Sequence, residues 1–192
     1  MSVVKIVLII VVVVLIIVGV GAGSFYYFLR RWDSEQPSKK DTLKPEVSEV
    51  VGRALIIYHP GATGYTEEAA YAVGKALQAE GWEVHLDRAN SRAISDLSDF
   101  NLLCVGSPTY MASPRPPIVN YINGCTNLEK RACLVLTTGG ADPNESNKKL
   151  QSLLKSRGGK VISSLALLTK QKDQLDELTE EFVEKIVEVM KK

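Results

Sequence analysis

The pattern of hydrophobic and polar positions first separates an apolar N-terminal stretch from the rest of the chain. No charged residue occurs from Ile6 to Leu29, and the run Ile6–Val18 consists only of Val, Ile and Leu. A helix of this length, rising about 1.5 Å per residue, crosses a hydrocarbon layer of about 30 Å. In lipid every backbone N–H and C=O must be paired within the segment, which favours a helix here. Residues 1–31 are therefore predicted to form a transmembrane anchor.

The flanks of this stretch bear on its role and orientation. The small residues Gly21–Ser24 leave open a cleaved signal peptide. The aromatic run Phe25–Phe28, followed by Arg30 and Arg31, is instead typical of a membrane interface with a basic stop, and it favours an anchor. More Lys and Arg residues follow the span than precede it. The sequence thus predicts a single-pass protein of the cell membrane with its C-terminal domain in the cytoplasm.

Residues 32–49 are polar, contain two prolines and show no apolar period. This composition predicts a linker between the anchor and a domain at residues 50–192. From Val50 onward the chain has 17 Lys and Arg against 17 Asp and Glu. Such a balance does not indicate a nucleic-acid partner. The three cysteines lack metal-type spacing and are expected to be reduced thiols, and no metal site is expected.

Within the domain, short apolar runs alternate with amphipathic stretches. The apolar runs have the length and β-branched content of strands, and they are Ala54–Tyr58, Val84–Leu86, Leu102–Val105, Leu134–Leu136 and Val161–Leu168. The amphipathic stretches predict helices over Thr66–Glu80, Pro116–Ile122, Asn144–Arg157 and Asp173–Met190, with only a short helical turn between Ser91 and Asp99. Five strands alternating with helices predict an α/β fold with a doubly wound parallel sheet.

In a doubly wound sheet the ligand crevice lies beyond the carboxyl ends of the strands, where strand order reverses. This rule directs attention to the loops after Tyr58, Val105 and Leu136. The first loop combines glycine with hydroxyl residues just before a predicted helix, an arrangement that suits a phosphate. An ordinary tight turn with Thr63 or Thr66 as helix cap explains the same residues.

The second and third loops suit a flat ring. Tyr110 can offer an aromatic face, and the loop Gly106–Pro114 around it can offer backbone amides. The third loop, Thr137–Asn144, is again rich in glycine and hydroxyl residues. Each loop also has a plain structural explanation: Tyr110 could pack on the next helix, and the third loop could be a simple connection capped by Asp142 or Asn144.

With these residues in view, the stretch from about Arg53 to Leu168 resembles the flavodoxin family and its flavodoxin-like FMN reductase relatives. The family's phosphate loop falls on Gly61–Thr66, its Gly-Ser-Pro-Thr-Tyr motif on Gly106–Tyr110, and its third flavin loop on Thr137–Asp142. The resemblance implies a five-stranded parallel sheet of order 2-1-3-4-5 and FMN as cofactor, as in flavodoxin, which serves as the standard example of this switch-point rule.

The resemblance also implies roles for particular residues. Thr63, Gly64 and Thr66 would hold the phosphate. The isoalloxazine would lie between two groups, which are Pro108, Thr109 and Tyr110 on one side and Thr138, Gly139 and Gly140 on the other. The complete set of expected cofactor-binding residues is Gly61, Ala62, Thr63, Gly64, Tyr65, Thr66, Pro108, Thr109, Tyr110, Thr138, Gly139 and Gly140.

Two positions depart from the family pattern. Gly61 stands where a phosphate-binding hydroxyl is usual, and Tyr65 replaces a smaller Asn, so different phosphate contacts are expected. The balanced charge of the domain also differs from that of strongly acidic flavodoxins. Among the remaining polar residues, His59 beside the first loop could tune a flavin or simply pack, and Arg115 could meet a phosphate-bearing donor such as NADPH or lie on the surface.

No acid–base or nucleophilic pair stands out, so no catalytic residue is assigned. The favoured hypothesis is a membrane-tethered FMN electron carrier whose partner is a redox protein or a quinone. Two alternatives stay open: an NAD(P)H-dependent quinone or FMN reductase, and a flavodoxin-like binding module that has lost its cofactor.

Overall fold

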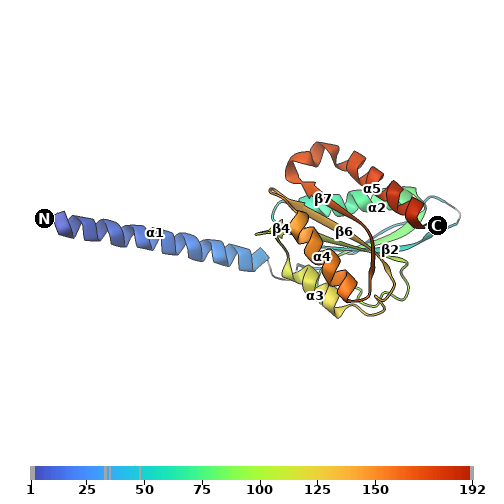
Figure 1. The fold of residues 1–192 in the computed structure, drawn as a ribbon, viewed down its shortest axis with the longest axis horizontal. Coiled ribbons are helices and arrows are strands. Elements are labelled where there is room, and N and C mark those ends of the chain that lie inside the picture. Colours follow the sequence, from blue (N-terminus) through green and yellow to red (C-terminus); the bar gives the residue numbers. More distant parts are fainter. Residues whose placement is uncertain (1–2, 33, 35, 48, 191–192) are drawn as a thin grey trace. The chain divides into compact units, whose positions relative to one another are not determined.

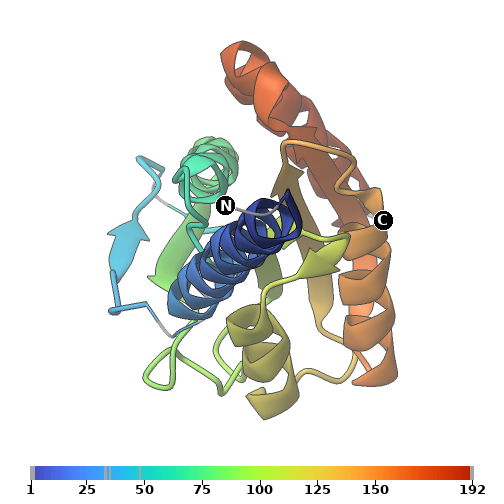
Figure 2. The same ribbon diagram turned by 90° about the vertical axis from the view of Figure 1, so that its left-hand side faces the viewer.

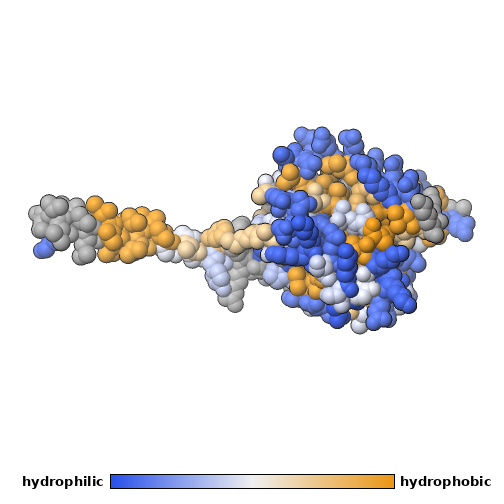
Figure 3. Space-filling view, viewed as in Figure 1, coloured by the Kyte–Doolittle hydropathy of each residue, from blue (hydrophilic) through white to orange (hydrophobic). Residues whose placement is uncertain are grey.

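The computed structural model describes residues 3–32, 34, 36–47 and 49–190, and the chain divides into two compact units between residues 34 and 35. The first unit is the helix α1 (Val3–Trp32), of 30 residues. Its segment Ile9–Tyr27 has a mean hydropathy of 2.7 and no buried residues, and its surface is apolar (Figure 3). Length and composition alone thus allow it to cross a membrane, a test that a signal sequence also passes.

The second unit is an α/β domain (Figure 1). Its strands are β1 (Asp41–Leu43), β2 (Gly52–Tyr58), β3 (Trp82–Arg88), β4 (Leu102–Tyr110), β5 (Ser113–Pro114), β6 (Ala132–Gly139) and β7 (Lys160–Leu168). Its helices are α2 (Tyr65–Ala79), α3 (Pro116–Gly124), α4 (Asn144–Ser156), the 3-10 helix η1 (Thr169–Gln174) and α5 (Leu175–Met190). All five predicted strands and all four predicted helices are present, and the strands are longer than the apolar runs that predicted them.

Strands β3, β2, β4, β6 and β7 lie side by side in that order, and every neighbouring pair among them is parallel. This arrangement confirms the predicted order 2-1-3-4-5. Parallel strands all end on the same side of a sheet. We call the side where β2, β4 and β6 end the carboxyl edge, and the opposite side, where they begin, the amino edge. From β2 the chain first forms β3 on one side of β2 and then crosses to β4 on its other side. The switch point therefore lies between the loops that follow β2 and β4.

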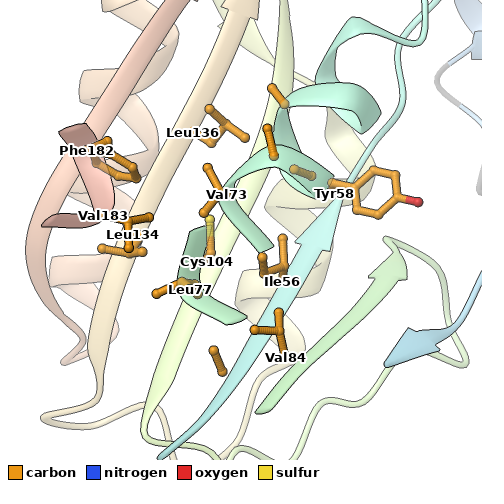
Figure 4. Close-up of a cluster of buried hydrophobic side chains, with 14 of the residues drawn as sticks. Ile56, Tyr58, Val73, Leu77, Val84, Cys104, Leu134, Leu136, Phe182 and Val183 are labelled. Atoms are coloured by element: carbon orange, nitrogen blue, oxygen red, sulfur yellow. The ribbon is translucent and has the colours of Figure 1, made fainter. Parts of the chain in front are cut away.

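Helices cover both faces of the sheet: α2 and α5 pack on one, and α3 and α4 on the other (Figures 1 and 2). Successive side chains of a strand point to opposite faces. Accordingly Ile56 of β2 joins the core beneath α2 and α5, whereas its neighbours Leu55 and Ile57 join the core beneath α3 and α4. The first of these cores also holds Val73 of α2 and Phe182 of α5 (Figure 4). Burial on both faces explains the unbroken apolar runs in the central strands β2, β4 and β6.

Three local predictions differ from the structure. Residues 36–47, expected to be part of a polar linker, contain β1, which pairs antiparallel with the edge strand β3. We call residues 36–47 the strap. The second loop is not open, because β4 continues to Tyr110 and pairs with β5 in a hairpin. Between Ser91 and Asp99 there is no helical turn, only turns and an isolated bridge from Asp96 to Thr126. In the first and third cases the backbone partners are residues far away in the sequence, which the local sequence does not reveal.

Candidate functional site

The first loop leads from β2 into α2 through two glycines in the left-handed region. Gly61 has a φ of 70° and Gly64 a φ of 74°. Gly64 is the N-cap of α2, and no side chain caps the helix there. The first N–H groups of an α-helix have no acceptor within the helix, so they face outward with the positive end of the helix dipole. This end of α2 can therefore accept an anionic group.

His59 holds the beginning of this loop. Its side chain is fully buried, and the Gly61 N–H donates a hydrogen bond to its Nδ1 atom at 3.1 Å. A ring nitrogen that accepts a hydrogen bond carries no proton, which fixes the tautomer of a neutral imidazole. Of the two roles considered for His59, the structure shows the packed one.

The structure explains why glycine occupies position 61. A Cβ atom on Gly61 would lie 3.0 Å from Cβ of Pro108, and the φ of 70° disfavours any side chain. The hydroxyl residue that the family resemblance leads one to expect would therefore not fit against the second loop. Any anion bound here must rely on backbone amides and on the neighbouring threonines.

Tyr65, the second departure, does not face the loop. Its side chain is 3% exposed and belongs to the core beneath α2 and α5, where burial raises the pKa of its hydroxyl. Only its backbone N–H takes part in the turn, where it donates a hydrogen bond to Thr63 Oγ1 at 3.3 Å. The size of this side chain thus does not crowd the space in front of α2.

The second loop reaches the first through Tyr110. Its hydroxyl accepts a hydrogen bond from the backbone N–H of Ala62 at 2.9 Å. Tyr110 ends β4, and residues Met111 and Ala112 turn the hairpin with φ values of 51° and 54°. Positive φ at both central residues is the geometry of a type I′ hairpin turn. Met and Ala are unusual in such a turn, and this is why the hairpin was not predicted.

Arg115 fixes the ring of Tyr110 from one side. Its guanidinium carbon lies 4.8 Å from the ring centroid, a cation–π contact. Arg115 is only 6% exposed, burial lowers its pKa, and its backbone N–H donates to Ser107 Oγ at 2.9 Å. Of the two roles considered from the sequence, the surface position is wrong because the side chain is buried, and the contact with a donor's phosphate stays a prediction. A flat ligand would have to stack on the opposite face of Tyr110.

The third loop contacts the first through two buried hydroxyls. Thr66 Oγ1 and Thr138 Oγ1 lie 2.7 Å apart, and the two residues are 1% and 3% exposed. Gly139 follows, where a Cβ atom would lie 2.9 Å from the carbonyl oxygen of Ala141 and 3.5 Å from Cβ of Thr109. Gly140 is exposed, with open space where its Cβ would be. The structure therefore brings residues of all three predicted loops together at the carboxyl edge.

The acidic residues at the start of α2 do not leave a net negative charge there. Glu67 accepts hydrogen bonds from Lys39 Nζ at 2.5 Å and from Arg88 at 2.9 Å, and Glu68 pairs with Lys172 at 2.7 Å. Burial alone would raise the pKa of Glu67, but the hydrogen bonds from Lys39 and Arg88 outweigh burial and lower it. A phosphate approaching the helix meets carboxylates that already have cationic partners.

These residues fit the two halves of a flavin mononucleotide. A phosphate can use the first turn of α2, where only the Tyr65 N–H is bonded to Thr63, and the Thr63 hydroxyl can donate to it, since nothing lies within 4 Å of a Cβ built on Gly64. On the ring side, Thr109 Oγ1 is buried and has no hydrogen-bond partner within the part of the chain that the structure describes. A buried hydroxyl without a partner is unfavourable unless a ligand or water supplies one.

Sequence reasoning missed the contribution of the strap to this edge. Asp87, near the end of β3, is 2% exposed and accepts hydrogen bonds from Ser38 Oγ and the Lys39 N–H, both at 2.9 Å. No local signal marks this contact, because 48 and 49 residues separate the partners. The one available indication was a buried aspartate next to Leu86, at the end of a strand whose other charged side chains are more exposed.

Comparison with known proteins supports the architecture. No protein-family model and no curated protein matches the sequence. Among solved structures, the Megasphaera elsdenii flavodoxin in its two-electron reduced form has a TM-score of 0.58 at 18% identity, over 68% of this chain and 98% of that one.

Two further solved structures are similar. Oxidised flavodoxin 2 from Bacillus cereus has a TM-score of 0.58 at 19% identity, over 69% of this chain and 99% of that one. An NADH:FMN oxidoreductase in its apo form has a TM-score of 0.52 at 20% identity, over 69% and 88%. Sheet order, flanking helices and these similarities together show that the domain has the flavodoxin fold, preceded in this chain by one apolar helix.

Proposed function

We propose that the domain binds FMN and that the protein acts in electron transfer, tethered to the cell membrane by α1. One observation carries the proposal. Two hydrogen bonds, Ala62 N–H to Tyr110 Oη and Thr66 Oγ1 to Thr138 Oγ1, join the three loops at the switch point of a flavodoxin fold. The similar structures include flavodoxins and an NADH:FMN oxidoreductase, which supports this choice of ligand.

In this proposal Thr63, Gly64 and Thr66 hold the phosphate through their backbone amides and the two threonine hydroxyls. The flavin ring lies between two groups of residues, namely Pro108, Thr109 and Tyr110 in the hairpin and Thr138, Gly139 and Gly140 in the third loop. The bound flavin supplies the redox chemistry, and the chain supplies binding, orientation and the surrounding charge.

The test is a titration of the detergent-purified, full-length protein with FMN, followed by flavin fluorescence and absorbance. Thr63→Ala removes a hydrogen bond to a charged group, and Tyr110→Ala removes the stacking face. Each change should weaken binding about tenfold. Thr126→Ala, at an exposed threonine near the amino edge, is the matched control and should leave affinity unchanged. A colourless protein that does not bind added FMN would end the proposal.

Within this proposal we favour an electron carrier over an enzyme that uses NAD(P)H. The similarity to an NADH:FMN oxidoreductase supports the reductase alternative. Steady-state oxidation of NADH and NADPH with a quinone or free FMN as acceptor separates the two. A carrier that receives electrons from a protein donor should show no turnover above the rate measured with free FMN alone.

A second candidate function is a binding module without cofactor. The observation that favours it is the Tyr110 hydroxyl, which occupies the amide of Ala62, one of the donors that a phosphate could use. If this second function is correct, Tyr110→Phe should change the stability of the protein. FMN should bind neither the natural protein nor the variant.

A further inference from the structure

The strap enters the domain at the edge that carries the three loops. β1 is antiparallel to β3, with Asp41 opposite Leu86 and Leu43 opposite Val84. β3 ends at Arg88, on the carboxyl edge. The residues that precede Asp41 therefore lie at the carboxyl edge, and the chain then runs along β3 toward the amino edge.

Hydrogen bonds hold the beginning of the strap at that edge. The carboxylate of Asp87 accepts hydrogen bonds from Ser38 Oγ at 2.9 and 3.0 Å and from the Lys39 N–H at 2.9 Å. Because Asp87 is 2% exposed, these bonds compensate a carboxylate that is largely removed from water. The attachment is a built feature of the fold and not a loose surface contact.

A second set of contacts ties the strap to the helix of the proposed phosphate turn. The Lys39 ammonium pairs with Glu67 in the first turn of α2 and lies 5.3 Å from the ring centroid of Tyr71. Arg88, at the end of β3, pairs with the other carboxylate oxygen of Glu67. Strap, β3 and α2 thus meet within one ion-pair cluster on the site edge.

Covalent connection sets how far this edge can lie from the end of α1, whatever the orientation of the two units. Five residues, 33–37, separate Trp32 from Ser38. Six extended steps span at most about 20 Å. The central strands β2 and β3 have seven residues each, so the amino edge lies roughly 20–25 Å beyond the carboxyl edge.

We propose that the strap is a positioning element that keeps the flavin edge close to the bilayer, where its redox partner is a quinone dissolved in the membrane. This inference rests on the membrane-tethered FMN function proposed above. The exchange balances: the two electrons and two protons lost by the reduced flavin are gained by the quinone, which becomes the quinol. By holding the flavin edge near the bilayer, the strap favours an electron acceptor that is dissolved in the membrane.

The short reach favours a quinone over a protein partner. A globular domain of about 100 residues has a radius of gyration of about 13 Å, and hence a diameter of more than about 30 Å. The connection holds Ser38 within about 20 Å of the end of α1, so a domain of this size could reach the carboxyl edge only from the side, and not from between the edge and the bilayer. A quinone head group requires only a few ångströms.

Fluorescent labels test the geometry independently of FMN. The natural cysteines are suited to this, because burial raises the pKa of Cys104 and Cys133 to about 12, raises that of Cys125, and leaves all three unreactive. Met111→Cys places a label on the hairpin tip of the carboxyl edge, where Met111 is 82% exposed. Ser156→Cys places one at the exposed end of α4, near the amino edge.

The full-length variants are reconstituted in phosphatidylcholine vesicles that contain a lipid with an acceptor dye on its head group. The proposal expects several-fold stronger energy transfer from the label at 111 than from the label at 156. A flexible Gly/Ser segment of about 12 residues adds roughly 20 Å of r.m.s. reach. Inserted between Ser34 and Glu35, it should remove most of the difference in energy transfer between the two labels. The same segment appended after Lys192 is the control and should not. Equal transfer from both labels in the uninserted chain would overturn the proposal.

The partner is tested with the same vesicles. After reduction of the flavin by dithionite, reoxidation by a long-chain quinone in the bilayer should slow several-fold on insertion, while reoxidation by a water-soluble short-chain quinone should not change. Rates that are indifferent to the insertion, or negligible reoxidation by the bilayer quinone, would reject the quinone and favour a protein partner. Failure of the proposed FMN function can be distinguished from failure of the positioning proposal. The first would appear as absent flavin absorbance, whereas the label measurements do not depend on FMN.

Discussion

The two edges of the sheet are built from similar residues but are closed in different ways. At the amino edge, mostly backbone bonds join the loops, from Val51 N–H to Gly81 O at 3.0 Å and from Lys130 N–H to Gly158 O at 2.8 Å, and Arg157 adds a side-chain bond to the Cys125 carbonyl at 3.1 Å. At the carboxyl edge, side chains join the loops, as in the bonds from Ala62 to Tyr110 and from Thr66 to Thr138. Both edges use glycines with positive φ.

The comparison separates structural glycines and hydroxyls from those available to a ligand. Gly81 and Gly158 follow α2 and α4, and φ values of 87° and 85° there are typical of helix ends. Gly61 and Gly64 precede a helix whose N-cap, Gly64, has no side chain, and of its first N–H groups the Tyr65 N–H bonds to Thr63 Oγ1. An edge closed by its own backbone offers a ligand little, whereas one held by side chains can exchange those bonds for bonds to a ligand.

The largest effect is expected at Gly61. Gly61→Ala forces a side chain into the left-handed region and within 3.0 Å of Pro108, which should destabilise the domain by about 3 kcal/mol. It should also weaken FMN binding, because the turn must shift. Thermal unfolding and FMN titration measure the two effects. Gly124→Ala, at the end of α3 and away from the three loops, adds a methyl group that meets open space and is the matched control; an equal loss in both variants would contradict the prediction.

The next effect concerns the pair Thr66 and Thr138. Replacing either by Val leaves the other buried hydroxyl without its partner and should cost about 2 kcal/mol of unfolding free energy. The double variant removes both polar groups together, so it should cost clearly less than the sum of the single changes. Denaturant unfolding of the three variants provides the cycle. Additive losses would show that the two hydroxyls do not depend on each other.

A smaller effect, restricted to stability, is expected at the amino edge. Gly158→Ala places a methyl group at a φ of 85°, 3.1 Å from Cγ of Glu129, and should destabilise the domain by about 1.5 kcal/mol. FMN affinity measured below the unfolding temperature should not change. A loss of affinity comparable to that of Gly61→Ala would mean that the two edges are coupled and that the amino edge also controls ligand binding.

The smallest effect is a pH dependence of the strap. Hydrogen bonds from Lys39 and Arg88 lower the pKa of Glu67 below its usual 4.5 despite burial, and the hydrogen bond to Glu67 raises the pKa of Lys39 above 10.5. A lowered folded pKa gives stability that is lost as pH falls through it, and a raised one gives stability that is lost as pH rises through it. The pair should therefore hold the strap between about pH 4.5 and 10.5.

Because Lys39 is half exposed, the contribution should be only about 0.5 kcal/mol. Hydrogen exchange of the Asp41–Leu43 amides across this pH range, corrected for intrinsic exchange, measures it. Lys39→Met should flatten the profile, whereas Lys148→Met, which breaks an exposed pair with Glu145 on α4, should leave it unchanged. A profile that Lys39→Met does not alter would assign the attachment to Asp87 alone.

The sequence by itself determined the order of strands and helices. Ala54–Tyr58 and Leu102–Val105 are apolar at every position, and only a strand buried on both faces requires this. Pro116 at the start of α3 and Gly158 after α4 mark helix ends by local backbone preference. The loops that hold the candidate site could be identified for the same reason, since parallel strands must end at one edge.

Only the tertiary structure decided which side chains meet at that edge. It assigned Tyr65 to the core, buried Arg115 against Tyr110, and turned the polar linker into a strap held by Asp87. Each of these outcomes depends on partners far away in the sequence or on the neighbouring loop, whose positions follow from how the elements pack. Local preferences fix the backbone of an element, whereas the neighbours of an exposed or half-buried side chain are fixed only when the sheet and its helices come together.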